Sequence, residues 1–90
     1  MILETPYEMA ADAAGRFRRV RISRKMTLKE LSERSGVPYS TIRRFESTGE
    51  ISFVALIKIA SALGEDQEIT GLFAEPVPQS IEEVIRGNRR

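Results

Sequence analysis

The sequence predicts an all-α fold, in which five helices form a compact domain and a short additional helix follows near the C-terminus. Apolar residues recur at intervals of three and four along several segments, and this spacing places them on one face of a helix. Helix-capping residues precede these segments and glycines follow them. No segment shows the apolar–polar alternation of a half-buried strand, so a sheet is not expected.

The first two helices are expected at about residues 10–25 and from residue 28 to residue 34 or 35. Thr27 and Glu30 have the spacing of a capping box at the start of the second helix, and Gly36 suits the left-handed conformation that ends many helices. One face of the first helix carries Ala14, Phe17, Val20 and Arg21.

A third helix is expected to include Pro38 in its first turn and to run to about residue 47, stopping at Thr48 and Gly49. Ser52 caps a fourth helix over residues 53–63, which Gly64 ends. The apolar face expected on this fourth helix consists of Phe53, Leu56, Ile59, Ala60 and Leu63.

Asp66 can cap a fifth helix over residues 67–75, although Gly71 weakens it. Two prolines then break the chain, and a capping box at residues 80–83 opens a short helix to about residue 86. We therefore divide the chain into an N-terminal extension with the start of the first helix (residues 1–13), a helical domain (residues 14–74) and a C-terminal segment with a short helix and a basic tail (residues 75–90).

Composition excludes several kinds of chemistry. The 90 residues include neither cysteine nor histidine, which removes disulfides, thiol catalysis and the commonest general base. There is no glycine-rich phosphate loop and no convergent set of carboxylates, so we expect no enzyme, no cofactor and no metal site. The longest strictly apolar run, residues 53–57, is too short to cross a bilayer, and acidic residues stand where a signal peptide would be basic. We expect a cytoplasmic protein without membrane contact.

Charge is segregated along the chain although the net charge is only +1. Residues 15–25 contain six basic residues and no acidic one, whereas residues 1–14 and 51–75 are net acidic. Such a basic segment favours a polyanionic partner.

Residues 26–46 have the layout of a helix-turn-helix, a unit whose second helix can enter the DNA major groove. A short helix, a turn at Gly36 and a second helix with adjacent Arg43 and Arg44 follow one another. The apolar positions at which two crossing helices would touch are Leu28, Leu31, Val37, Ile42 and Phe45.

Residues 15–73 resemble the Cro/phage-repressor (XRE-type) helix-turn-helix family, whose domains have the lambda-repressor-like fold. The similarity lies in GRFRRVRISRKMTLKELSERSGVPYSTIRRFESTGE followed by ISFVALIKIASALG. The resemblance implies a five-helix domain that binds double-stranded DNA, usually as a homodimer on short inverted repeats. Leu28 stands where many relatives have a phosphate-binding glutamine, and Pro38 where serine or threonine is common.

By position, the resemblance implies base contacts from the exposed face of the second helix of the motif, namely Tyr39, Ser40, Arg43 and Arg44. Arg44 is the strongest candidate because a guanidinium can bond guanine O6 and N7 together. Contacts to phosphate are expected from Thr27, Thr48, Ser52, Arg18, Arg19 and Lys25. A solvated basic surface, or plain helix capping by the hydroxyls, remains the alternative for each of these residues. The resemblance also implies a structural ion pair between Arg21 and Glu46.

The function expected from these features is that of a sequence-specific transcriptional repressor acting as a homodimer. The segments RRFESTGEIS, ASALG, GLF and SIEEV further resemble HipB-type antitoxins, which repress their own operon and bind a kinase-like toxin protein. The alternative is a protein-interaction module of the same fold that has lost DNA binding. Candidate dimer-forming residues are Ile69, Leu72, Phe73, Ile81, Val84 and Ile85, of which the first three can instead pack in the core.

Overall fold

The structure is a computed structural model that describes residues 4–74, and helices account for 72% of them. The described part contains no strand. Its helices are α1 (Pro6–Ser23), α2 (Leu28–Ser35), α3 (Tyr39–Thr48), α4 (Phe53–Ala62) and α5 (Asp66–Thr70). The predicted five-helix, all-α fold is confirmed, whereas the short C-terminal helix lies outside the described residues.

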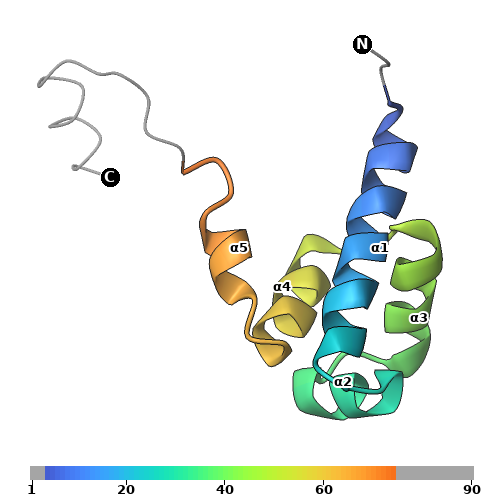
Figure 1. Ribbon diagram of the computed structural model, residues 1–90, viewed down its shortest axis with the longest axis vertical. Coiled ribbons are helices and arrows are strands. Elements are labelled where there is room, and N and C mark those ends of the chain that lie inside the picture. The colour runs from blue at the N-terminus through green and yellow to red at the C-terminus, as the bar shows by residue number, and fades with distance from the viewer. Residues whose placement is uncertain (1–3, 75–90) are drawn as a thin grey trace, which may run out of the picture.

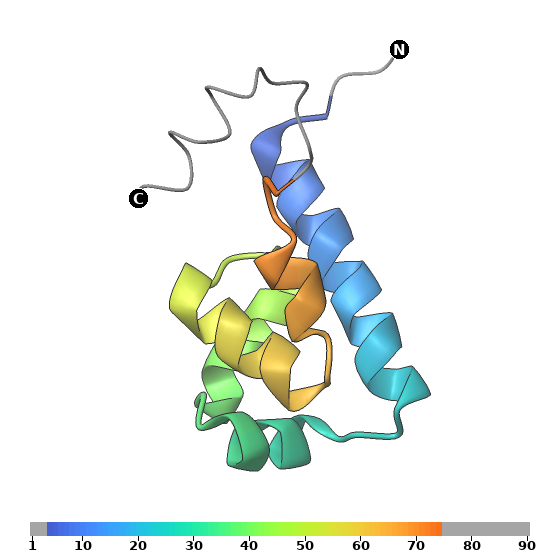
Figure 2. The same cartoon turned by 90° about the vertical axis from the view of Figure 1, so that its left-hand side faces the viewer.

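The long helix α1 forms one side of the domain, and α3 packs along it (Figure 1). α2 packs against both α3 and α4, and α5 packs against α4. The first turns of α1 rise above the other four helices in both views (Figure 2), and residues 4–9 are all exposed. This part of α1 therefore contributes nothing to the core.

The core forms where α1, α2, α3 and α4 meet. The rings of Phe17 and Phe45 meet edge to face with centroids 5.3 Å apart, which joins α1 to α3. The buried cluster consists of Ala14, Leu31, Val37, Ile42, Phe45, Ile59 and Leu63. Most apolar positions expected in the core are therefore confirmed. Phe53 is an exception: its side chain lies in the first turn of α4 and is 56% exposed.

Local capping rules hold at α2 and α4. The Thr27 hydroxyl accepts a bond from the Glu30 N–H (3.0 Å), and the Glu30 carboxylate accepts one from the Thr27 N–H (3.0 Å). Gly36 ends α2 in the left-handed conformation, with φ 76°. Ser52 caps α4 through a bond from the Ala55 N–H.

The expected start of the first helix, near residue 10, is wrong. α1 begins at Pro6 because Thr5 and Glu8 form a second capping box, with bonds of 2.9 and 3.1 Å. The helix also ends at Ser23 and not at residue 25, since Lys25 adopts a left-handed conformation with φ 55°.

The bounds of the third and fifth helices also differ from expectation. Pro38 is the N-cap of α3, its carbonyl accepts the N–H of Thr41 (3.0 Å), and α3 ends one residue later, at Thr48. Asp66 is the first residue of α5 and not its cap. α5 stops before Gly71 instead of continuing to residue 75, because the chain turns there and Phe73 takes a left-handed conformation with φ 58°.

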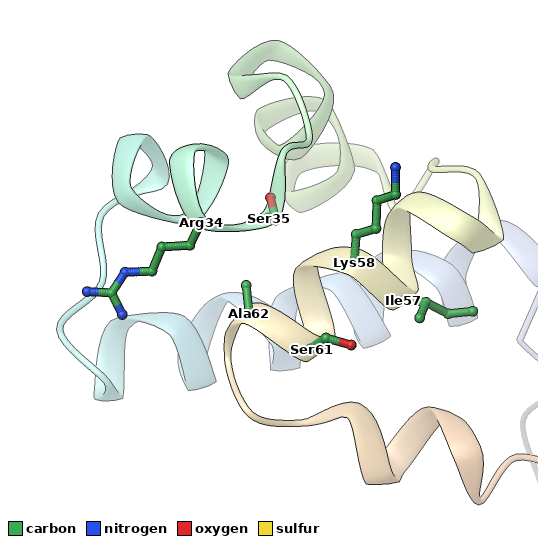
Figure 3. A pocket seen from close by; sticks show the side chains of 6 residues that line it. All are labelled: Arg34, Ser35, Ile57, Lys58, Ser61 and Ala62. Atoms are coloured by element: carbon green, nitrogen blue, oxygen red, sulfur yellow. The ribbon is translucent and has the colours of Figure 1, made fainter.

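A hollow of about 410 Å³ lies between the end of α2 and the outer side of α4 (Figure 3). Arg34 and Lys58 line it, and their side chains point in different directions. No residue of α3 contributes to this hollow. Because its charged groups do not converge on one point, it is a poor candidate for a ligand site.

Candidate nucleic-acid interface

The outer face of α3 presents polar and basic side chains over a buried apolar face. Ile42 and Phe45 are 0% and 3% exposed, so they fix which side of α3 faces the core. The turn before α3 is held by Ser32, which donates to the Val37 carbonyl at 2.6 Å. The residues left exposed on α3 include all four predicted base-binding positions, Tyr39, Ser40, Arg43 and Arg44.

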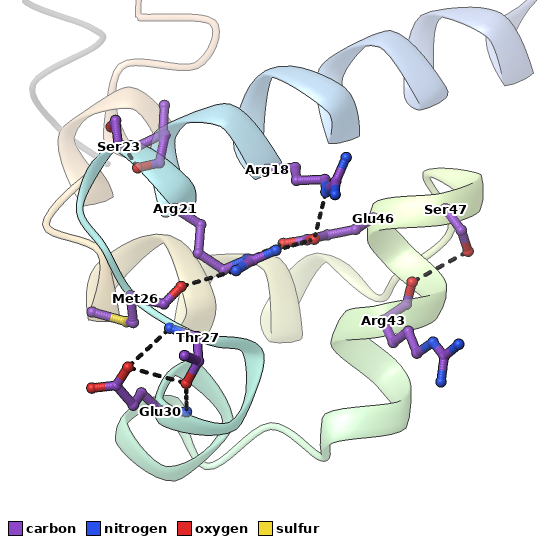
Figure 4. A network of polar contacts seen from close by, with 10 residues as sticks. Arg18, Arg21, Ser23, Met26, Thr27, Glu30, Arg43, Glu46 and Ser47 are labelled. Atoms are coloured by element: carbon purple, nitrogen blue, oxygen red, sulfur yellow. Dashed lines mark hydrogen bonds and ion pairs between the residues drawn. The ribbon is translucent and has the colours of Figure 1, made fainter.

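Arg21 of α1 and Glu46 of α3 form a two-bond ion pair beneath this face (Figure 4). Arg21 Nε lies 2.7 Å from Glu46 Oε2, and Nη2 lies 2.9 Å from Oε1. The side chains are only 10% and 6% exposed. Hydrogen bonding to Glu46 raises the pKa of Arg21, so the guanidinium stays charged. Arg21 Nη1 also donates to the Met26 carbonyl at 2.9 Å, which connects α1, α3 and the approach to α2.

This ion pair decides the charge of the α3 surface. Glu46 is the only acidic residue within α3, and its carboxylate is turned inward toward α1. Arg18 lies 3.9 Å from the same carboxylate, while the Arg43 side chain points away from it (Figure 4). No carboxylate of α3 itself therefore offsets the positive charge of Arg43 and Arg44 on its exposed face.

A carboxylate that follows α3 in the chain also contacts this face, and the sequence did not predict this contact. Arg44 Nη2 donates to Glu50 Oε1 at 2.6 Å, and the two side chains are 68% and 51% exposed. The residues are six positions apart across Gly49, a separation that no helical pairing rule covers. The strongest base-reading candidate therefore has an intramolecular partner.

A family model described as helix-turn-helix matches residues 17–66, from the middle of α1 to the start of α5. The match covers more than half of the chain. The chain belongs to the XRE-type helix-turn-helix family. Helix-turn-helix proteins of this family are DNA-binding transcription regulators and typically not enzymes, and the chain is a regulator of this class. No curated protein and no solved structure matches the chain significantly.

In this helix-turn-helix, α2 is the supporting helix and α3 the recognition helix. The hydroxyl residues predicted to bind phosphate lie at or near helix ends and are all exposed. Thr27 and Ser52 are the N-caps of α2 and α4. The Thr48 hydroxyl donates to the Arg44 carbonyl at 2.7 Å and accepts the Glu50 N–H at 3.1 Å. Each hydroxyl thus has a local structural role in the helix-turn-helix domain.

The three predicted phosphate-binding cations differ in their surroundings, although all are exposed. The Arg18 guanidinium lies near the carboxylate of Glu46 on the recognition helix. The end of the Arg19 side chain instead lies beside Gly15, one turn back along α1. Lys25 follows α1 in the loop before α2. Arg24, which was not predicted, pairs with Glu65 at 2.6 Å and joins the end of α1 to the start of α5.

Residues 4–74 hold no cluster of three side chains suited to binding a metal ion. Within that same range, no helix combines the length and the hydrophobicity needed to span a bilayer.

Proposed function

We propose that the protein is a sequence-specific transcriptional repressor that binds an inverted-repeat operator as a homodimer. The observation that carries this proposal is the composition of the exposed face of α3. That face presents two arginines, a tyrosine and a serine, while the only carboxylate of the helix is neutralised by Arg21. A helix with such a face can approach the polyanionic duplex without a repulsive charge of its own.

The base-reading role is assigned to the exposed residues of the recognition helix. Tyr39 and Ser40 lie in its first turn, the part that enters the groove deepest in this motif. Arg44 is proposed to bond guanine O6 and N7 through its planar guanidinium. Arg43 extends from the same helix and can reach a base edge or a phosphate.

Phosphate contacts are assigned to positions that flank this helix. Thr27 and Ser52 stand at helix N-termini, where the backbone N–H groups and the helix dipole favour an anion. Thr48 is the last residue of the recognition helix, and in this docking geometry it is proposed to lie beside the phosphate backbone that borders the groove. Three exposed cations, Arg18, Arg19 and Lys25, are proposed to add electrostatic affinity that does not depend on base sequence.

The Arg21–Glu46 pair is proposed to fix the angle of the recognition helix and not to add net stability. An ion pair withdrawn from water roughly offsets its own desolvation. Its two bonds are directional, however, and they join α3 to the longest helix of the domain.

Homodimer formation is proposed because one recognition helix makes few base contacts. Two such helices must lie about 34 Å apart to read successive major-groove faces. Leu72 and Phe73, which follow α5, are 45% and 99% exposed, whereas Ile69 is partly buried. Their exposure supports a contact surface here. The other candidates, Ile81, Val84 and Ile85, lie outside the described residues.

A salt titration tests the DNA-binding mechanism. Binding through several phosphates predicts that log K falls steeply and linearly with log salt concentration, with a slope near −0.9 for each neutralised phosphate. The probe is a fluorescent duplex selected by the protein from a random-sequence pool. A lack of affinity for every duplex at low salt would instead support the alternative, a protein-interaction module that shares the fold.

We extend the proposal to an antitoxin that represses its own operon and binds a kinase-like toxin in the cytoplasm. The exposed carboxylates Asp66 and Glu68 lie on α5, so this end of the domain offers a partner an acidic surface beside the proposed dimer contact. A kinase-like reading frame adjacent to this gene, whose product co-purifies with the protein, would support this role. An unrelated neighbouring gene, or a kinase-like product that does not bind, leaves a free-standing regulator.

A further inference from the structure

We infer that Glu50 restrains DNA binding by competing with the DNA for Arg44. While Glu50 holds the guanidinium, Arg44 gains little binding free energy by exchanging this carboxylate for a phosphate on DNA of arbitrary sequence. It gains more where a guanine presents two acceptors at once. This inference rests on the proposed function of Arg44 as a base reader.

The local geometry keeps Glu50 beside Arg44. The Thr48 hydroxyl donates to the Arg44 carbonyl (2.7 Å) and accepts the Glu50 N–H (3.1 Å), so one side chain connects the backbones of both partners. Gly49 turns the chain with φ 85°, and an added Cβ there would lie 2.5 Å from the backbone of Ala10. The loop that carries Glu50 is therefore fixed against α1.

The position of Glu50 also draws Arg44 away from the deepest part of the groove. Glu50 follows the C-terminal end of α3, whereas Tyr39 and Ser40 lie in the first turn, at the opposite end. The observed guanidinium is thus held toward the outer end of the recognition helix. To read a base, Arg44 must leave Glu50, and a carboxylate without its partner then faces the phosphate backbone.

The relative strengths of the competing contacts decide whether Arg44 leaves Glu50. An exposed ion pair contributes little, because both charges are well solvated and two flexible side chains are ordered. A single phosphate offers Arg44 a similar exposed contact, so the exchange is close to neutral. A two-bond guanine contact discriminates by roughly 5- to 150-fold, which is enough to outweigh the lost pair.

The test compares wild type with Glu50→Gln by fluorescence anisotropy. One probe is a duplex selected by wild type from a random pool, and the other is a scrambled duplex of the same composition. We expect Glu50→Gln to bind the scrambled duplex about threefold or more tightly, with a salt slope steeper by about one. Affinity for the selected duplex should rise by at least a similar factor, because Arg44 must leave Glu50 in that complex as well.

Two further variants separate this mechanism from a simple change of charge. Glu68→Gln makes the same charge change at an exposed position on α5 and should leave the affinity for both duplexes nearly unchanged. In an Arg44→Ala background, Glu50→Gln should no longer tighten binding to either duplex. An undiminished effect there would mean that Glu50 repels phosphate directly, and this would overturn the inference.

Unchanged affinity of Glu50→Gln for both duplexes would also overturn the inference while leaving the proposed repressor function intact. Failure of the wild-type protein to bind any duplex would be a different result. It would remove the proposed function and, with it, the role of Glu50.

Discussion

Arg21 and Glu46 lie 25 positions apart in the sequence and meet through two parallel hydrogen bonds of 2.7 and 2.9 Å. The third nitrogen of the guanidinium donates to the Met26 carbonyl. One side chain thus contacts the recognition helix and the loop that leads to its supporting helix. Because no other residue joins these three segments through charged hydrogen bonds in residues 4–74, the pair links the orientation of α3 to α1.

Glu46→Ala is expected to destabilise the domain by on the order of 3 kcal/mol, because it leaves the Arg21 charge withdrawn from water without its carboxylate. Replacing both partners with apolar residues, as in Arg21→Met with Glu46→Leu, should cost much less. Urea unfolding followed by circular dichroism gives both free energies.

The matched control for this change is Glu50→Gln, which breaks an exposed pair and should cost less than about 1 kcal/mol. Equal costs for Glu46→Ala and Glu50→Gln would contradict the structural role of the inner pair. If the double variant kept its stability but lost operator affinity, the role proposed for the pair in orienting α3 would gain direct support.

Gly49 and Gly36 both end a helix in the left-handed conformation, yet their surroundings differ. At Gly36 an added Cβ meets no atom within 4 Å, so Gly36→Ala should cost only the conformational penalty of about 1 kcal/mol. At Gly49 the Cβ would lie 2.5–2.7 Å from the backbone of residues 10 and 11. Gly49→Ala should cost at least twice as much, because α3 must move away from α1.

Thermal and urea unfolding of the two glycine variants measure this difference. Similar losses at both positions would mean that the end of α3 does not pack closely on α1. A smaller loss for Gly49→Ala than for Gly36→Ala would contradict the packing altogether.

The sequence predicts those features that depend on local rules. The Thr27–Glu30 capping box and the left-handed Gly36 need only neighbouring residues, and both occur as expected. The Thr5–Glu8 box follows the same pattern but lies outside the predicted helix, because the apolar stripe of α1 begins only at Ala14. The first turns of α1 bury nothing, so hydrophobic periodicity gives no signal there.

Contacts that depend on tertiary placement could not be predicted from spacing. The Arg24–Glu65 pair spans 41 positions, and the Arg44–Glu50 pair crosses a left-handed glycine after the helix has ended. The Arg21–Glu46 contact was anticipated only through the family resemblance, since no local rule connects residues 25 positions apart. Sequence therefore indicated which surface is functional but not which carboxylates contact it.

The capping boxes predict a dependence of stability on pH. Bonds from the backbone and hydroxyl of Thr27 lower the pKa of Glu30 below its ordinary value of 4.5, and bonds from Thr5 lower the pKa of Glu8. A carboxylate that is favoured only in the folded state releases its proton more readily there than in the unfolded chain. This stabilisation is complete above about pH 4.5 and is lost as the pH falls through the lower folded-state pKa.

Glu30→Gln should therefore lower stability at pH 6 and flatten the fall in stability between about pH 5 and pH 3. Glu4 provides the control, because its hydrogen bond with Asp12 raises its pKa and gives the opposite sign. Glu4→Gln should leave the acid-induced loss unchanged or make it steeper. Urea unfolding at a series of pH values measures these slopes, and identical slopes in wild type and Glu30→Gln would contradict the capping role.

Arg44→Ala and Arg19→Ala are expected to impair DNA binding in different ways. Loss of Arg44 should cost about 1–3 kcal/mol on a selected duplex and relax the base preference at one position. Loss of Arg19 should weaken all duplexes similarly and reduce the magnitude of the salt slope by about one. Anisotropy titrations with selected and base-substituted duplexes distinguish the two, and the reverse pattern would exchange the roles assigned to these arginines.

The exposed aromatic side chain after α5 gives a test of the proposed homodimer. Phe73 is 99% exposed, so Phe73→Glu removes no packing within the domain and should leave its helicity unchanged. If this side chain lies in the dimer contact, burying a charge there is costly, and the variant should sediment as a monomer at concentrations where wild type is dimeric.

Phe53 offers a matched control because it is also aromatic and is 56% exposed, on α4. Phe53→Glu should remain dimeric. Phe73→Glu should in addition bind a palindromic duplex more weakly than wild type, because the two half-sites are then bound by separate monomers and not by one linked dimer. Dissociation of the Phe53→Glu dimer alone would place the interface on α4. A wild-type protein that sediments as a monomer at every concentration, with and without the duplex, would remove the homodimer from the proposed mechanism.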